Sequence, residues 1–340
     1  MKKKIPAGIL ISAALLTGPA LAFREYRRNF HVRMADPTGF TDHYFETHPE
    51  LRHEEFSVAS SLGPKIRGFV FDPEAEPKAL IVMTHGYNLS MENYLPLVHL
   101  FTRAGFKVLF FDGIGVGISE GQAIYGLPQH INDMKSVLDA VSEDPEMNSL
   151  PLLLFGHSWG GYAACCVPCL KDYPIRGILT CAAFRKSSSS MIPTINKRYP
   201  KAAPFLVAFA EAMERMFFGR TAALTSTEGL ARVDCPARLY HSADDAIVSF
   251  EESFLKVKEA LSDRENLSFV SLEGRNHNLY LPPANDRQQR RIRKLLRADL
   301  SESFRQELNA ELWYLMSRTD EDMAEEFIEF FNNCLQGDNL

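Results

Sequence analysis

The chain has 340 residues, 46% of them hydrophobic, and a formal net charge of −6 at pH 7. This length and composition can bury one large core, so we expect a single catalytic domain. The acidic balance gives no sign of a nucleic-acid partner, because nucleic-acid-binding domains usually carry a basic surface. The six cysteines and ten histidines show no zinc-type pairing, and no phosphate-binding lysine motif occurs. The sequence therefore predicts no metal and no cofactor.

The first 23 residues have the pattern of a targeting signal. Three lysines follow Met1, and the run Ile5–Phe23 contains no charge. Together with Ala20-Leu21-Ala22, this pattern fits a secretory signal cleaved after Ala22. The uncharged run is also just long enough to span a bilayer as an anchor. We therefore expect an exported or membrane-anchored protein, and a cytoplasmic protein is the less favoured alternative. The sequence leaves cleavage and anchoring both open, and an uncleaved anchor would associate the protein with the membrane through its N-terminus.

Two apolar runs in the first half of the chain predict buried parallel strands. Ala79–Met83 is followed by Thr84-His85-Gly86-Tyr87-Asn88. Lys107–Phe111 is followed by a loop with alternating glycines, Asp112–Gly121. This loop misses the dinucleotide-binding spacing G-x-G-x-x-G, and the next helix signal begins only near Pro128. A phosphate cradle is therefore not predicted.

A third apolar run, Leu152–Phe155, leads directly into Gly156-His157-Ser158-Trp159-Gly160-Gly161. A strand that ends in G-x-S-x-G and turns at once into a helix is a nucleophile elbow. At such a turn the serine backbone is strained, and strand and helix approach so closely that only glycine fits on either side. We expect a helix from Trp159 to about Lys171, with Ser158 as the candidate nucleophile. The alternative is a glycine-rich turn with an incidental serine.

In this order the motifs resemble those of the α/β-hydrolases, of the bacterial esterase and serine-aminopeptidase-like type, from about Phe56 to Leu335. The resemblance implies an α/β fold with a mostly parallel central sheet, flanking helices and a helical cap. It also implies an oxyanion hole formed by the backbone N–H groups of Tyr87 and Trp159. Ile114 departs from the pattern, because many members carry arginine at that position. Which side chains hold the glycine loop in place is therefore left open.

The resemblance also implies an acid and a base after later strands, in the order Ser, Asp or Glu, His. A strand predicted over Ala237–His241 is followed by two aspartates, Asp244 and Asp245. The family pattern places the acid three residues before a valine, here Val248, and so selects Asp245. His241 is interpreted as a packed or hydrogen-bonded neighbour of the acid.

The candidate base is His277. It follows a strand predicted over Leu267–Leu272, and it is the only histidine after the last predicted strand. With Ser158 and Asp245 it implies a two-step acyl transfer through an acyl-enzyme.

The predicted activity is hydrolysis of a carboxylic ester, thioester or amide with serine as the nucleophile. Small to medium lipophilic or lipid-like esters are the leading substrates. The alternatives are a non-catalytic binding protein with the same fold, or a peptidase or lysophospholipase. Dehalogenases and epoxide hydrolases are disfavoured, because they place aspartate where Ser158 stands.

The expected domains are a signal or anchor over 1–22, an N-terminal extension over 23–55 and a catalytic domain over 56–340, with a cap inserted at about 184–233. Apolar residues recur in the cap at helical spacing. Packing against the core is one interpretation of this stripe. The alternative is that Phe209 and Met213 line an acyl pocket and bind substrate.

The C-terminal part of the chain adds two further expectations. Arg290, Arg293, Lys294 and Arg297 share one face of a predicted helix, which is interpreted as solvated surface or as a contact with anionic lipid. The final helix is expected over Glu321–Cys334. Disulfide pairing among Cys181, Cys235 and Cys334 and the oligomeric state are left open.

Overall fold

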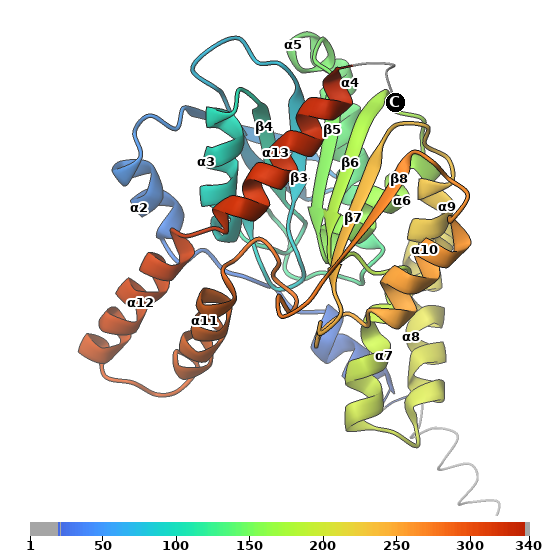
Figure 1. Cartoon of the computed structure of the whole chain (residues 1–340). Coiled ribbons are helices and arrows are strands. Elements are labelled where there is room, and N and C mark those ends of the chain that lie inside the picture. The colour runs from blue at the N-terminus through green and yellow to red at the C-terminus, as the bar shows by residue number, and fades with distance from the viewer. Residues whose placement is uncertain (1–19, 21, 337–340) are drawn as a thin grey trace, which may run out of the picture.

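The computed structural model describes residues 20 and 22–336 (Figure 1). Its centre is an eight-stranded sheet in the order β1-β2-β4-β3-β5-β6-β7-β8. The strands from β4 to β8 pair in parallel, whereas β2 pairs antiparallel with both β1 and β4. This mostly parallel sheet with helices on both faces confirms the predicted α/β-hydrolase fold.

The strands in the middle of the sheet consist of uninterrupted apolar runs. A parallel strand covered on both faces buries all its side chains, so it lacks the alternation of a half-exposed strand. β3 and β4 are buried at every position, whereas β1, at the edge, is largely exposed. The strands are β1 His53–Ala59, β2 Lys65–Phe71, β3 Leu80–Thr84, β4 Lys107–Asp112, β5 Leu152–His157, β6 Ile175–Cys181, β7 Ala237–Ser242 and β8 Leu267–Leu272.

Two hydrophobic clusters cover the two faces of the sheet. Leu80 and Val82 of β3 face the cluster that contains α4, α6 and α9, and Ile81 and Met83 face the cluster that contains α3 and α13. Figure 1 shows α3 and α13 crossing the near face. A helix over 22–30 precedes the helices α2 Phe40–Thr47, α3 Leu95–Arg103, α4 Gln129–Glu143, α5 Pro145–Asn148, α6 Trp159–Cys166, α7 Ser187–Arg198, α8 Ala203–Phe218, α9 Ser226–Leu230, α10 Lys256–Ala260, α11 Pro283–Leu295, α12 Glu302–Met316 and α13 Glu321–Leu335.

The helix after the elbow is shorter than the sequence predicted. It ends at Cys166 and continues only as a 3-10 turn over Val167–Cys169. Pro168 lies in this turn and lacks the N–H that an α-helical hydrogen bond requires, so the helix cannot run to Lys171.

The segment between β6 and β7 contains α7, α8 and α9, and Figure 1 shows α7 and α8 side by side at one end of the sheet. The serine run Ser187–Ser190 forms the first turn of α7. Ser189 accepts a hydrogen bond from the backbone N–H of Lys186, and the hydroxyl of Ser187 donates to Glu214 of α8. Serine side chains satisfy free N–H groups at a helix start, which favours a helix here.

The basic face predicted near the C-terminus is not a free cationic surface. Arg290 bonds to Asp286, and Arg293 lies half-buried with its guanidinium against the sulfur of Met316. Of the four side chains predicted to share this face, only those of Lys294 and Arg297 are exposed.

The residues before α2 are tied to the glycine loop after β4. The Arg33 guanidinium donates to the backbone carbonyls of Gly117, Ser119 and Gly121, at 2.5, 3.1 and 2.8 Å. Ile114 is buried in the core beneath the loop. The cationic side chain that hydrogen-bonds to this loop therefore comes from the N-terminal segment and not from residue 114.

Among residues 20 and 22–336, we find no helix whose length and apolar character would let it cross a membrane. The predicted signal or anchor, residues 1–22, lies outside the described residues except for Ala20 and Ala22.

Arg33→Met is expected to lower the free energy of unfolding by about 2 kcal/mol, because it removes charge-assisted hydrogen bonds to loop carbonyls. Urea denaturation measures this loss. Arg28→Met, at an exposed position of the preceding helix, is the matched control and should change stability by less than about 0.5 kcal/mol. Equal stability of the two variants would contradict the assigned role of Arg33.

Candidate active site

Ser158 lies at the turn between β5 and α6, with φ 55° and ψ −109°. A Cβ atom added at Gly156 would lie 2.3 Å from the carbonyl oxygen of Gly160, and one added at Gly160 would lie 2.5 Å from that of Thr84. Neither position admits a side chain. The strained backbone is held by the N–H of Ser158, which donates to the carbonyl of Cys181 at 2.7 Å.

The structure brings the three predicted triad residues together. His277 Nε2 lies 2.9 Å from Ser158 Oγ, and His277 Nδ1 lies 2.7 Å from Asp245 Oδ2. A carboxylate only accepts, so Nδ1 carries the proton and the neutral ring accepts the Ser158 hydroxyl at Nε2. This arrangement lets the imidazole take up a proton from the serine.

Asp245 is held by its own loop. Its Oδ1 accepts hydrogen bonds from the N–H groups of Ile247 and Val248, at 2.8 and 2.9 Å. The neighbouring Asp244 instead accepts from the Ser242 hydroxyl and from the N–H of Asn276. The geometry therefore places Asp245, and not Asp244, against His277.

Two histidines contact the Asp245 carboxylate. The Nε2–H of His241 lies 3.2 Å from both Asp245 Oδ2 and the carbonyl of Val248. Burial by itself raises the pKa of Asp245, but the charges and hydrogen bonds of His277 and His241 outweigh burial and hold the pKa well below its usual range. The carboxylate therefore stays ionised and can stabilise a charged His277.

The two predicted oxyanion donors flank Ser158. Among the described residues the backbone N–H groups of Tyr87 and Trp159 donate to no protein acceptor, which leaves both free for an oxyanion. A Cβ added at Gly86 would lie 3.3 Å from the Cβ of Ser158, so the loop after β3 lies directly beside the serine. The Gly160 N–H donates to the carbonyl of His85 and ties this loop to α6.

A buried network connects the three loops of the site, and the sequence did not reveal it. The Gly86 N–H donates to the Tyr94 hydroxyl at 2.9 Å, and that oxygen lies 2.8 Å from His157 Nδ1. The His157 Nε2–H donates to the carbonyl of His277 at 3.1 Å. Burial, with a smaller effect of His277, lowers the pKa of His157 to about 3, so its ring stays neutral and Nδ1 accepts from Tyr94.

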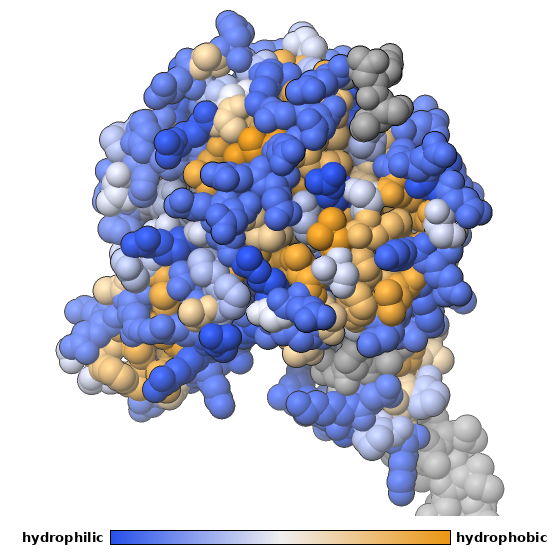
Figure 2. All heavy atoms as spheres, in the orientation of Figure 1, coloured by the Kyte–Doolittle hydropathy of each residue, from blue (hydrophilic) through white to orange (hydrophobic). Residues whose placement is uncertain are grey.

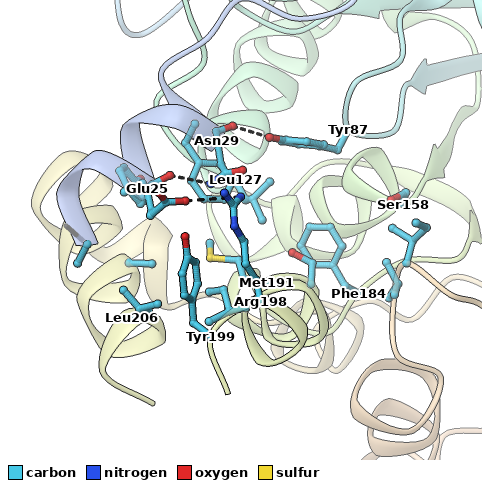
Figure 3. Close-up of a pocket in the computed structure, with 18 residues that line it drawn as sticks. Glu25, Asn29, Tyr87, Leu127, Ser158, Phe184, Met191, Arg198, Tyr199 and Leu206 are labelled. Carbon is cyan, nitrogen blue, oxygen red and sulfur yellow. Dashed lines mark hydrogen bonds and ion pairs between the residues drawn. The ribbon is translucent and has the colours of Figure 1, made fainter. Parts of the chain in front are cut away.

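A cavity of about 300 Å³ opens beside Ser158 (Figure 3). Its lining is mainly apolar and comes from the helix over 22–30, from the loop after β3, and from α7 and α8. Phe209 and Met213 do not line it, so their prediction as pocket residues is wrong for this cavity. Met213 packs against the core, and α8 instead presents Leu206 and Ala210.

The cysteines that the sequence left as disulfide candidates are unpaired. Cys181, Cys235 and Cys334 are free, and burial raises the pKa of Cys235 to about 11 and that of Cys334 to about 12. The disulfides left open by the sequence are therefore not formed. Within the described part of the chain, no three His, Cys, Asp or Glu side chains are grouped so that they could hold a metal ion.

The fold and the hydrogen-bonded Ser158, His277 and Asp245 define an α/β-hydrolase. Residues 75–223 match the family described as serine aminopeptidase, S33. Over these residues the chain is similar to that family, and its fold is that of the α/β-hydrolases.

Curated relatives agree with this assignment. A monoacylglycerol lipase of Mycolicibacterium smegmatis is 29% identical over 109 residues, which are 32% of this chain and 38% of that protein. A monoglyceride lipase of Homo sapiens is 32% identical over 94 residues, 27% of this chain and 30% of that protein. The chain therefore spans well under two thirds of the length of these relatives.

Solved structures show the same fold. A thermostable carboxyl esterase from Bacillus coagulans has a TM-score of 0.56 at 16% identity, over 84% of this chain and 99% of that chain. An esterase from Pyrococcus furiosus has a TM-score of 0.54 at 17% identity, over 71% of this chain and 89% of that chain. At such identities the likeness establishes the fold alone.

Tyr94→Phe is expected to lower the free energy of unfolding by about 2 kcal/mol, since it leaves the buried Gly86 N–H and His157 Nδ1 without a partner. Thermal or urea unfolding measures the change. Tyr314→Phe removes a hydroxyl from an exposed tyrosine and serves as the control, with an expected loss of less than about 0.5 kcal/mol. Wild-type stability of Tyr94→Phe would rule out the network as a structural tie.

Proposed function

We propose that the protein is a serine hydrolase that cleaves carboxylic esters carrying one lipophilic chain. The observation that carries this proposal is that Ser158, hydrogen-bonded to His277, opens onto a mainly apolar cavity. Apolar cavities bind lipophilic groups, and a few polar groups at one end fix the reacting atom. The similarity to monoacylglycerol and monoglyceride lipases supports a lipid-like ester as substrate.

In the proposed reaction, Ser158 Oγ attacks the acyl carbon while its proton passes to His277 Nε2. The carbonyl oxygen becomes an oxyanion that the N–H groups of Tyr87 and Trp159 stabilise. His277 then gives the proton to the leaving alkoxide, which departs as the alcohol and leaves the acyl group on Ser158. A water molecule repeats the sequence with His277 as base, releasing the acid and restoring the serine. Asp245 stays ionised throughout.

A purely binding role is disfavoured by the backbone at residue 158. A non-glycine residue at positive φ costs about 1 to 3 kcal/mol and persists where the surrounding structure forces it. Binding an apolar ligand requires neither this strain nor a histidine hydrogen-bonded to the serine. Both features are required to present an activated nucleophile.

A fluorophosphonate probe is expected to label wild-type protein at Ser158, as intact-mass analysis would show. Ser158→Ala should abolish labelling. His277→Ala should lower ester turnover by about 10⁵-fold or more, and Asp245→Asn by about 10³- to 10⁴-fold, because the asparagine favours the wrong imidazole tautomer. Asp244→Asn is the matched control and should retain activity near the wild-type level.

If folded wild-type protein neither reacted with the probe nor hydrolysed any ester, the proposed activity would be contradicted. If Asp244→Asn and Asp245→Asn lost activity equally, the assignment of the acid would be wrong.

We further propose that the protein is exported or anchored at a membrane through residues 1–22. The uncharged run and its flanking lysines support this proposal. If these residues form an anchor, the protein should sediment with membranes and resist extraction by alkaline carbonate. If they form a cleaved signal, the mature protein should begin at Phe23. N-terminal sequencing and fractionation separate the two. A full-length, freely extracted chain would exclude both.

A further inference from the structure

The helix over 22–30 forms one wall of the cavity that contains Ser158. Tyr26 and Phe30 supply its apolar surface. Across the cavity lie Met191 of α7 and Leu206 of α8, and Figure 3 shows the helix opposite these side chains. The helix lies outside residues 75–223, which carry the family match. The cavity is thus a slot between an N-terminal element and the inserted helices.

This wall is fixed to the catalytic loops. The Tyr26 hydroxyl donates to the carbonyl of Tyr125 at 2.8 Å, and the Tyr87 hydroxyl donates to the carbonyl of Asn29 at 2.5 Å. The ring of Phe30 packs edge-on against Tyr87, with centroids 6.2 Å apart. Since the N–H of Tyr87 flanks Ser158, the helix and the oxyanion loop share one residue. The wall is therefore part of the site.

A charged pair lines the slot at a distance from Ser158. Arg198 of α7 lies 3.7 Å from Glu25, and both line the cavity. In Figure 3 Glu25 and the Arg198 guanidinium lie beside each other, well away from Ser158. The Glu25 side chain is 14% exposed and that of Arg198 is 48% exposed, so the pair stands where the apolar lining meets solvent.

We propose that the apolar chain of the substrate lies in this slot and that the Glu25–Arg198 pair sets the longest chain that the slot accepts. The inference rests on the proposed ester hydrolysis. Each methylene buried along the apolar lining should raise kcat/KM by about fourfold. A chain that reaches the pair must desolvate two charges or displace them, so longer chains gain nothing.

The test measures kcat/KM for p-nitrophenyl esters from acetate to palmitate with full-length protein. The variants are Glu25→Gln, Arg198→Met and the double variant. Glu25→Gln keeps the size of the side chain and removes its charge, and Arg198→Met keeps an unbranched apolar stem and removes the guanidinium. Lys197→Met is the matched control, because Lys197 is the exposed neighbour of Arg198 on α7 and does not line the cavity. Acetate turnover reports on the catalytic residues, since an acetyl group does not reach the pair.

For wild type and Lys197→Met, kcat/KM should rise with chain length and then level off or fall at the same ester. In the double variant the rise should continue for at least two more methylenes, giving about a fifteenfold gain on that longer ester with unchanged acetate turnover. Identical profiles in the wild type and the double variant would overturn the proposal.

A second measurement does not depend on catalysis. The Ser158→Ala forms of wild type and double variant are titrated with straight-chain fatty alcohols, and binding is followed by displacement of anilinonaphthalene sulfonate. A length limit that moves in the double variant supports the slot even if no ester is hydrolysed. Ester hydrolysis with no shift of the limit in either assay would refute the slot and leave the proposed activity intact.

Discussion

Backbone contact between α6 and the ends of β3 and β5 is the constraint on which the rest of the site depends. Gly156 and Gly160 are needed because the carbonyl oxygens opposite them leave no room for a side chain. This close approach forces the serine between them into positive φ and directs its side chain out of the sheet. It also brings the loop after β3 within hydrogen-bonding distance of the helix, so the nucleophile and one oxyanion donor are positioned by the same contact.

The remaining groups of the site come from loops that meet because the strands before them are parallel. β5, β7 and β8 end at the same edge of the sheet, and Ser158, Asp245 and His277 follow them in that order. Loops are mobile unless their polar groups are satisfied, and here the Tyr94 hydroxyl and His157 connect the loops beneath the triad. A neutral, buried histidine suits this task, because it donates and accepts at once without adding a charge beside Asp245.

The sequence predicted the part of this architecture that depends on local pattern. Buried parallel strands show as continuous apolar runs, and residues that follow such strands were correctly expected to converge. Helical spacing in the cap predicted an amphipathic helix but not which of its sides faces the cavity, so it selected Phe209 and Met213 instead of Leu206 and Ala210. Contacts between distant segments, such as those of Arg33 and Tyr94, have no local signature and became visible only in the structure.

The helix over 22–30 is synthesised before the segments that it contacts across the cavity. Its hydrogen bonds to Tyr87 and Tyr125 span 58 and 99 positions, and its contact with Arg198 comes later still in the chain. Until α7 and α8 leave the ribosome, the side of this helix that will face the cavity has nothing to cover it. Long-range contacts form slowly, and uncovered apolar surface promotes misassembly. Completion of the cavity therefore marks a late stage of folding, at which the first described helix closes against segments synthesised long after it.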